Sequence, residues 1–142
     1  MQAPFRILLI EDNDADVFLV QTALEESGLQ FELAVCSDGE EAIRTVAQIQ
    51  SGKAPCPDLL LLDMNLPKFG GDEILGFIEA GAGDESYSVV VITSSDSPVD
   101  RAQATAFGVD YYFRKPADLE QFLKLGEIVR ATLLSRAERR AP

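Results

Sequence analysis

Acidic, hydroxyl and amine side chains follow four short apolar runs of the sequence, each at the point where the run ends. Glu11 and Asp12 follow one run, and Asp63, Thr93 and Lys115 each follow another. A carboxylate is a competent nucleophile toward phosphorus. We therefore predict that Asp63 accepts a phosphoryl group.

Three neighbouring carboxylates repel one another unless a cation lies between them. At about 4 Å and an effective dielectric of about 20, each pair costs roughly 4 kcal/mol. Oxygen ligands without histidine or thiolate favour Mg²⁺. Glu11, Asp12 and Asp63 are therefore predicted metal ligands, and Asn65 is placed to add its backbone carbonyl. The cation, the amine and the hydroxyl would together offset the charge on a transferring phosphoryl group.

The apolar runs alternate with segments of helical spacing. Strands are predicted at 5–10, 31–36, 59–62, 88–92 and 111–113. Helices are predicted at 14–28, 40–50, from 72 to the closing Gly81 and Gly83, at 98–107, and from 119 to near Arg136, with Asp14 and Asp118 as caps of the first and last. The helical residues predicted to face the core are Val17, Val20, Leu24, Ile43, Val46, Ala47, Ile74, Leu75, Ile78, Leu119, Phe122, Val129 and Leu133.

Five alternating strand and helix units predict an α/β fold with a parallel sheet and helices on both faces. Right-handed crossovers favour a doubly wound, flavodoxin-like sheet with the strand order 2-1-3-4-5. The carboxyl ends of its strands share one edge, where ligands bind in such folds. We expect residues 1–136 to form this domain and residues 137–142 to form a short tail.

Each candidate residue also has an ordinary structural interpretation. Asp12 could cap a helix, Thr93 could belong to a turn, and Lys115 could be a solvated surface lysine. Residues 63–65 could form a loop with Asx-type hydrogen bonds. The functional interpretation rests on the joint placement of an acid pair, an acid, a hydroxyl and an amine at four strand ends.

Composition excludes several classes of function. The 142-residue chain has no histidine, which removes histidine-based catalysis and histidine-ligated zinc. Its net charge of −12 disfavours non-specific binding to nucleic acid or an anionic membrane. Cys36 and Cys56 are predicted to be ordinary thiols. Without a secretion signal or a membrane-length apolar segment, a cytoplasmic location is expected.

The motifs together resemble those of a response regulator receiver domain. They are Ile-Glu-Asp-Asn at 10–13, Leu-Asp-Met-Asn-Leu-Pro at 62–67, Gly-Gly at 70–71, Ile-Thr-Ser at 92–94 and Lys-Pro at 115–116. The likeness runs over nearly the whole chain. It implies that a histidine kinase of a two-component phosphorelay phosphorylates Asp63. It also implies that Glu11, Asp12 and the carbonyl of Asn65 organise Mg²⁺.

The resemblance further implies a conformational switch. Thr93 and Lys115 would bind the phosphoryl group, and Tyr112 lies where the family places an aromatic that moves inward as Thr93 turns toward the phosphate. A dianionic phosphoryl group would shift a pre-existing equilibrium between the two Thr93 orientations. An ordinary half-buried strand tyrosine is the alternative for Tyr112. In this family the Lys115–Pro116 bond is often cis.

A narrower likeness is to single-domain regulators that are paired with bacterial phytochrome histidine kinases. It rests on Glu-Asp-Asn at 11–13, the loop at 51–57 and the segment 64–72. A tolerated insertion would explain the loop equally well. Because the sequence stops after the receiver motifs, we expect a stand-alone regulator with no DNA-binding output domain, which signals through protein contacts.

The last predicted helix carries a second apolar set, Leu125, Ile128 and Thr132. A broad core contact and a partner face are equally compatible with it. We hypothesise that the fourth helix, the fifth strand and the last helix form a homodimer surface. Five basic and two acidic residues give residues 121–142 a net charge of +3. The basic set Arg136, Arg139 and Arg140 is interpreted as a solvated helix end.

The leading hypothesis is a phosphoacceptor that catalyses its own phosphorylation and dephosphorylation without turning over a metabolite. Two other classes stay open. A Mg²⁺-dependent phosphatase with an aspartyl nucleophile usually resembles a D-x-D pattern after the first strand, whereas Asp63 and Asn65 follow the third. A pseudo-receiver that only binds partners would not need the intact acids, hydroxyl and amine. Turnover of a small phosphate ester would favour the phosphatase, and failure to bind beryllofluoride with Mg²⁺ would favour the pseudo-receiver.

Overall fold

Five parallel strands form one sheet in the order β2-β1-β3-β4-β5. The computed structural model describes residues 3–81 and 87–140 of the chain. The strands are β1 (Phe5–Ile10), β2 (Phe31–Cys36), β3 (Leu59–Asp63), β4 (Ser88–Thr93) and β5 (Tyr111–Arg114). Ile10 pairs with Leu62, and Asp63 pairs with Ile92, so the strand ends lie in register. The predicted doubly wound fold and strand order are confirmed.

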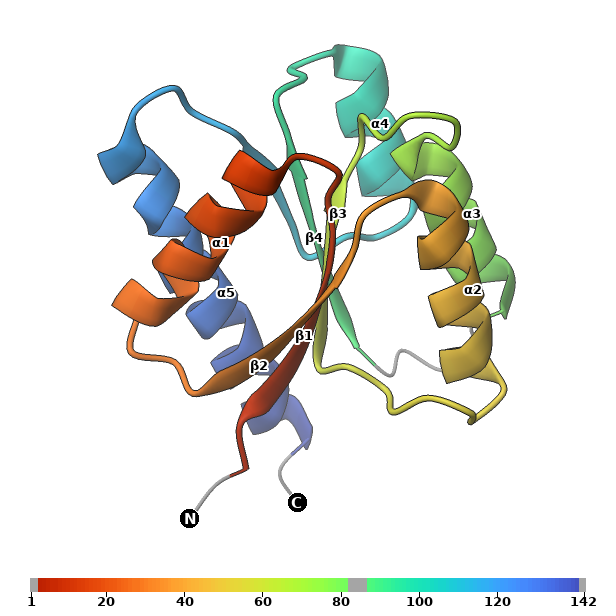
Figure 1. Cartoon of the computed structure of the whole chain (residues 1–142), viewed down its shortest axis with the longest axis horizontal. Coiled ribbons are helices and arrows are strands. Elements are labelled where there is room, and N and C mark those ends of the chain that lie inside the picture. Colours follow the sequence, from red (N-terminus) through yellow and green to blue (C-terminus); the bar gives the residue numbers. More distant parts are fainter. Residues whose placement is uncertain (1–2, 82–86, 141–142) are drawn as a thin grey trace.

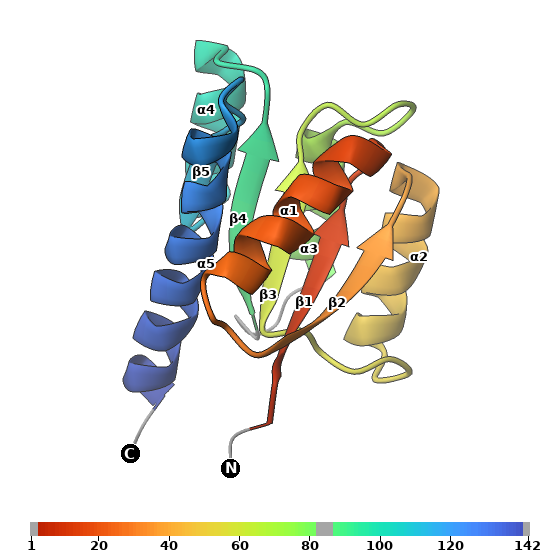
Figure 2. The ribbon, with the colours of Figure 1, turned by 60° about the vertical axis from the view of Figure 1, so that its left-hand side comes forward.

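Five helices cover the two faces of this sheet. They are α1 (Asp14–Glu26), α2 (Gly39–Gln50), α3 (Gly71–Gly81), α4 (Pro98–Ala106) and α5 (Leu119–Arg140). Helices α1 and α5 lie on one face, and α2, α3 and α4 lie on the other (Figures 1 and 2). The predicted closing residue Gly83 lies outside the described residues. No helix within the described residues has both the length and the apolar character needed to cross a membrane.

Strand β3 is buried on both faces, which explains its unbroken apolar run. Leu59 and Leu61 belong to the core beneath α1 and α5, whereas Leu60 and Leu62 belong to the core beneath α2, α3 and α4. This division follows from the two-residue side-chain period of a strand. Burial of each leucine contributes about 1.5–3 kcal/mol. The strand is thus a fixed base for Asp63 at its end.

Helix α1 is capped by Asn13, so the prediction of Asp14 as its cap is wrong. Asn13 has an extended backbone, and its side chain accepts the backbone N–H of Asp16 at 3.0 Å. Asp14 instead begins the first turn, where a negative charge suits the helix dipole.

Two predicted core positions, Ala47 and Leu119, are wrong because each helix presents a slightly different face from the one expected. Ala47 is exposed, and α2 packs through the predicted Val46 together with Ala42, which was not predicted. Leu119 is 54% exposed, whereas Leu125 is fully buried. Leu125 belongs to the core beside α1, so a partner face that includes it is excluded.

Close contact between α5 and α1 at Gly126 explains the face that α5 presents. A Cβ atom at this position would collide with the backbone carbonyl of Ala23 in α1. Because the two backbones touch here, the neighbouring Leu125 is pressed into the core between the helices. The absence of a side chain at residue 126 therefore sets the rotation of α5.

We expect Gly126→Ala to destabilise the protein by about 1–3 kcal/mol, since neither backbone can yield without a shift of a whole helix. Urea denaturation would measure the change. Gly76→Ala in α3 is the matched control, because its Cβ would meet only Phe107 at an ordinary 3.9 Å. Alanine at residue 76 should leave stability unchanged or raise it by up to about 1 kcal/mol. Equal effects of the two substitutions would contradict the close contact.

Helix α5 continues to Arg140, so its predicted end near Arg136 is wrong. Arg136 lies on the buried face, one turn beyond Leu133, and is only 9% exposed. Its guanidinium lies 3.7 Å from a carboxylate oxygen of Asp58, the residue before β3. The interpretation of Arg136 as part of a solvated helix end is therefore also wrong.

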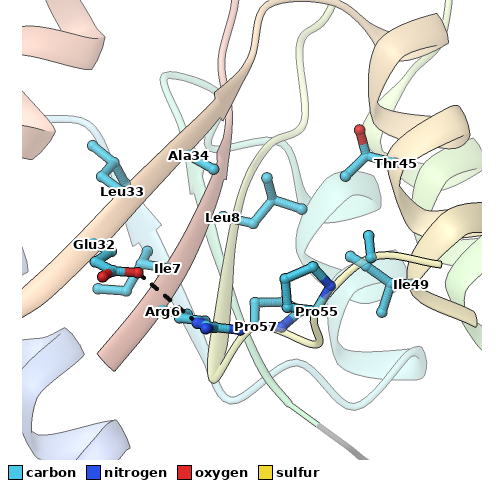
Figure 3. Close-up of a pocket in the computed structure, with 11 residues that line it drawn as sticks. Arg6, Ile7, Leu8, Glu32, Leu33, Ala34, Thr45, Ile49, Pro55 and Pro57 are labelled. Atoms are coloured by element: carbon cyan, nitrogen blue, oxygen red, sulfur yellow. Dashed lines mark ion pairs between the residues drawn. The ribbon is translucent and has the colours of Figure 1, made fainter. Parts of the chain in front are cut away.

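The loop of residues 51–57 forms one wall of a pocket of about 450 Å³ at the side of the sheet (Figure 3). The other walls come from β1, β2 and the C-terminal half of α2. The lining residues are Arg6, Ile7, Leu8, Glu32, Leu33, Ala34, Thr45, Ile49, Ala54, Pro55 and Pro57. Most of these side chains are apolar, so the loop packs beside the edge strand β2. The pocket lies at the end of the sheet away from Asp63.

Candidate functional site

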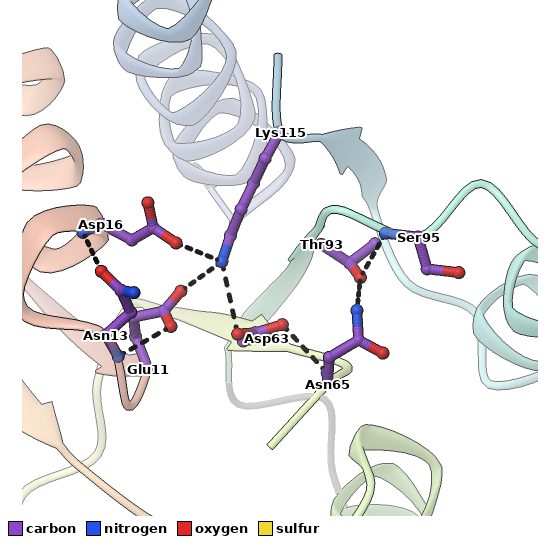
Figure 4. Close-up of polar contacts among 8 residues, drawn as sticks. All are labelled: Glu11, Asn13, Asp16, Asp63, Asn65, Thr93, Ser95 and Lys115. Carbon is purple, nitrogen blue, oxygen red and sulfur yellow. Dashed lines mark hydrogen bonds and ion pairs between the residues drawn. The ribbon is translucent and has the colours of Figure 1, made fainter. Parts of the chain in front are cut away.

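The carboxyl ends of β1, β3 and β5 bring two acids and a lysine into direct contact (Figure 4). Lys115 Nζ lies 2.7 Å from Glu11 Oε2 and 3.3 Å from Asp63 Oδ2. The side chains of all three residues are at most 11% exposed. This excludes the interpretation of Lys115 as a solvated surface lysine.

Asp16 is a member of this group that sequence reasoning missed. Its Oδ2 lies 2.8 Å from Lys115 Nζ, so the ammonium contacts three carboxylates. The side chain comes from the first turn of α1, where the Asn13 cap places it over the end of β1. The available signal was the Asn-x-x-Asp spacing of residues 13–16, in which an asparagine cap precedes an acid by three residues.

Glu11, Asp12 and Asp63 form the part of the site that could hold a metal ion. One carboxylate oxygen from each of these residues lies within 4.8 Å of the others. Glu11 and Asp63 are buried, and Asp12 is exposed. A donor set of oxygen atoms alone suits a hard divalent cation that keeps several waters. Asp12 does not cap α1, because Asn13 does, and its ordinary interpretation is therefore excluded.

Burial and charge shift two pKa values in the site. Burial of Glu11, assisted by the negative charge of Asp63, raises its pKa to about 7 against the opposing effect of Lys115. Burial by itself would lower the pKa of Lys115, but hydrogen bonds to Asp16 and Glu11 and the charge of Asp63 raise it overall. The lysine is thus held as an ammonium ion, while Glu11 is poorly stabilised as a carboxylate.

Asn65 connects Asp63 to Thr93. Its backbone N–H donates to Asp63 Oδ1 at 3.0 Å, which is the Asx-type hydrogen bond that the ordinary interpretation predicts. Its side-chain amide donates to Thr93 Oγ1 at 2.7 Å, a contact that the sequence did not indicate. Thr93 is fully buried, and Asn65 links its hydroxyl to the Asp63 carboxylate. The proposed role of the Asn65 carbonyl as a ligand stays a prediction.

Ser95 links Thr93 to Tyr112. The Ser95 N–H donates to Thr93 Oγ1 at 3.1 Å, and the Tyr112 hydroxyl donates to the Ser95 carbonyl at 3.0 Å. The guanidinium of Arg101 lies 4.5 Å from the centre of the Tyr112 ring, within range of a cation–π contact. Tyr112 is half-buried, and burial raises its pKa. A single peptide segment therefore contacts both residues of the predicted switch.

The Lys115–Pro116 bond is trans, since no peptide bond of the described residues is cis, and the expectation of a cis bond is wrong. The trans isomer is the intrinsically favoured one by about 0.5–1 kcal/mol. The Lys115 N–H donates to the Thr93 carbonyl at 2.7 Å in this arrangement.

Comparison with protein families identifies the group to which this site belongs. The response regulator receiver domain family matches residues 7–126, which is most of the chain. This protein is a response regulator receiver. The receiver is 33% identical over 127 residues to the probable methanogenesis regulatory protein FilR2 of Methanothrix harundinacea, with 89% of this chain and 82% of FilR2 covered. It is 36% identical over 123 residues to the response regulator Rcp1 of Synechocystis, with 86% and 84% covered.

Solved structures place the receiver near regulators that are associated with phytochromes. The phosphorylated cyanobacterial phytochrome response regulator RcpA has a TM-score of 0.82 at 35% identity, covering 94% of this chain and 96% of RcpA. The Mn²⁺-bound form of Rcp1 has a TM-score of 0.76 at 32% identity, covering 90% and 93%. The bacteriophytochrome response regulator AtBRR has a TM-score of 0.69 at 34% identity, covering 87% and 90%. The narrower likeness to phytochrome regulators is thereby confirmed.

Proposed function

We propose that this receiver accepts a phosphoryl group on Asp63 from a histidine kinase and passes the signal on through protein contacts. The observation that carries the proposal is the position of Asp63. The carboxylate ends a buried strand, lies within the cluster of metal-ligating acids, and has Lys115 Nζ at 3.3 Å. An ordinary loop acid would need none of these neighbours.

The transfer would form one bond and break one bond. An oxygen of Asp63 forms a bond to phosphorus while the P–N bond of the kinase phosphohistidine breaks, and the electron pair stays on the imidazole, which takes up a proton. Lys115 and Thr93 offset the negative charge on the phosphoryl oxygens. No general base is required, because the carboxylate is already ionised. Hydrolysis of the same acyl phosphate would return Asp63 to its resting state.

Glu11, Asp12 and Asp63, with the carbonyl of Asn65, would hold Mg²⁺, which supplies positive charge beside the phosphoryl oxygens when it is bound. The donor chemistry of this chain supports the assignment, because only oxygen atoms converge here. The existence of a Mn²⁺-bound form of the related Rcp1 supports a divalent ion as the ligand of this receiver.

The switch would operate through the segment that contains Ser95. If Thr93 turns toward the phosphoryl group, its hydroxyl leaves the N–H of Ser95, and the Ser95 carbonyl that holds Tyr112 is then free to move. Tyr112 could turn inward only if it also leaves Arg101. The phosphoryl group would thus shift an equilibrium between two arrangements of this segment.

Phosphotransfer profiling tests the proposed function. The wild-type chain would be mixed with each phosphorylated histidine kinase of its host, with Mg²⁺ present, and label would be followed for one minute. We expect rapid transfer from one kinase, and the likeness to RcpA and AtBRR makes a bacterial phytochrome the first kinase to test. The label should be released by hydroxylamine, as for an acyl phosphate. Absence of transfer from every kinase, together with failure to bind beryllofluoride, would overturn the proposal.

A homodimer through α4, β5 and α5 is the second part of the proposal. Each of these elements carries a large exposed apolar side chain: Val99, Tyr111 and Leu119 are 64%, 45% and 54% exposed. Light scattering at high concentration with beryllofluoride and Mg²⁺ should give the mass of two chains, and Val99→Asp should return it to one. Phe18→Asp on α1, which is 68% exposed, is the matched control and should leave the dimer intact. A single-chain mass under all conditions would count against the dimer.

A further inference from the structure

The contacts of Lys115 separate Asp16 from the other acids of the site. An ammonium group has three N–H donors, and in this structure each has a carboxylate partner, in Glu11, Asp16 and Asp63. Glu11 and Asp63 also belong to the group of acids that could hold a metal ion, whereas Asp16 does not. Among the three carboxylate partners of Lys115, Asp16 is thus the one that lies outside the group of acids that could hold a metal ion.

Asp16 is held in place by its own helix. Its backbone N–H donates to the Asn13 cap at 3.0 Å, and its side chain is 25% exposed. Both carboxylate oxygens of Glu11 already accept hydrogen bonds. Oε1 accepts the N–H of Asn13 at 3.1 Å, and Oε2 accepts from Lys115. A cation among Glu11, Asp12 and Asp63 would compete with Lys115 for two of its three partners and would repel the ammonium. Without Asp16, nothing among the described contacts would then keep Lys115 at the site.

We propose that Asp16 is a positioning residue that keeps the Lys115 ammonium beside Asp63 when a divalent cation occupies the acidic cluster. This inference rests on the proposed function of Asp63. In the metal-loaded protein, Lys115 stays bound to Asp16 and remains within reach of an incoming phosphoryl group. Asp16 itself contacts neither the metal nor the phosphoryl group, and acts only through the lysine.

The first test compares Asp16→Asn with Asp14→Asn. Asp14 lies in the same turn of α1 and is exposed, so its substitution makes the same change of charge near the same helix end. Phosphorylation by acetyl phosphate would be followed by intact mass at several donor concentrations, and Mg²⁺ affinity by calorimetry. We expect Asp16→Asn to lower the maximal rate about tenfold, with less than a twofold change in Mg²⁺ affinity or in the donor concentration at half-maximal rate. Asp14→Asn should match wild type, and Asp16→Glu should recover most of the rate.

The second test observes the lysine directly. The chain has four lysines, so the side-chain ammonium signals in a ¹⁵N–¹H spectrum can be assigned by single substitutions. The Lys115 signal should persist in wild type when Mg²⁺ is added, and should broaden beyond detection in Asp16→Asn, where the ammonium is released to water. A signal that behaves alike in the two proteins would overturn the inference.

The outcomes separate this inference from the proposed function. Absence of phosphorylation in the wild-type chain would defeat both. Normal phosphorylation of wild type with an unchanged or faster rate in Asp16→Asn would defeat the role of Asp16 alone, as would a parallel loss of Mg²⁺ affinity.

Discussion

Replacing Asp63 with asparagine should lower the rate of phosphorylation of this receiver by a factor of at least about 100. This corresponds to an increase of about 2.7 kcal/mol in the activation free energy. The amide has nearly the shape of the carboxylate, and its oxygen can still accept the N–H of Asn65, now at 3.0 Å. The amide has no ionised oxygen to attack phosphorus, however, and it carries no charge to attract a divalent cation. The chemistry should therefore be lost while the fold remains.

Label retained after transfer from the cognate kinase, separated on a phosphate-affinity gel, measures this effect. Asp72→Asn serves as the control, because Asp72 is an exposed acid in the first turn of α3 and is not in the acidic cluster. It should be labelled like wild type. Label retained in Asp63→Asn would show that another residue accepts the phosphoryl group, and would remove the central assignment of the site.

The meeting of Glu11, Asp63, Thr93 and Lys115 could be predicted because it depends only on strand ends. In a parallel sheet, the residue that follows each apolar run must reach the same edge, whatever the details of packing. Those details decide the other contacts. Asp16 and Lys115 are 99 residues apart in the sequence, and their contact depends on whether Asn13 or Asp14 caps α1. A shift of the cap by one residue would turn Asp16 by about 100° around the helix.

The face of α5 shows a second limit of sequence reasoning. Leu119 and Leu125 are chemically identical, and helical spacing admits both to an apolar stripe. Their opposite burial follows from the approach of α1 at Gly126, a contact between backbones that leaves no apolar pattern. Arg136 shows the reverse case, a residue that was expected to be exposed and is buried. Its charge suggested solvent, but its partner Asp58 belongs to a distant part of the chain.

The metal-free receiver should lose stability as the pH rises from about 4.5 to about 7, because of Glu11. The pKa of this carboxyl is raised from 4.5 to about 7 in the folded protein, mainly by burial. Between these values the folded state binds more protons than the unfolded state, so stability falls with increasing pH. The full shift is worth about 3 kcal/mol. The raised pKa of Lys115 also makes stability fall with increasing pH, but only above about pH 10, so it does not alter this window.

Glu11→Gln isolates this effect, because the amide resembles the protonated carboxyl at every pH. In urea denaturation with a chelator present, the variant and wild type should be about equally stable near pH 4.5. The variant should become the more stable by about 3 kcal/mol above pH 7. A difference that does not change with pH would contradict the assignment of the shift to Glu11.

Addition of Mg²⁺ at pH 7.5 should reduce the stability advantage of Glu11→Gln over wild type. A cation that binds only the folded state stabilises it in proportion to its affinity, and this affinity depends on the ionised Glu11 carboxylate. Wild type should therefore gain more stability from Mg²⁺ than Glu11→Gln does. The ionised Glu11 carboxylate, whose burial beside Asp63 weakens the metal-free fold, is thus the group that makes the strand edge a site for a divalent cation.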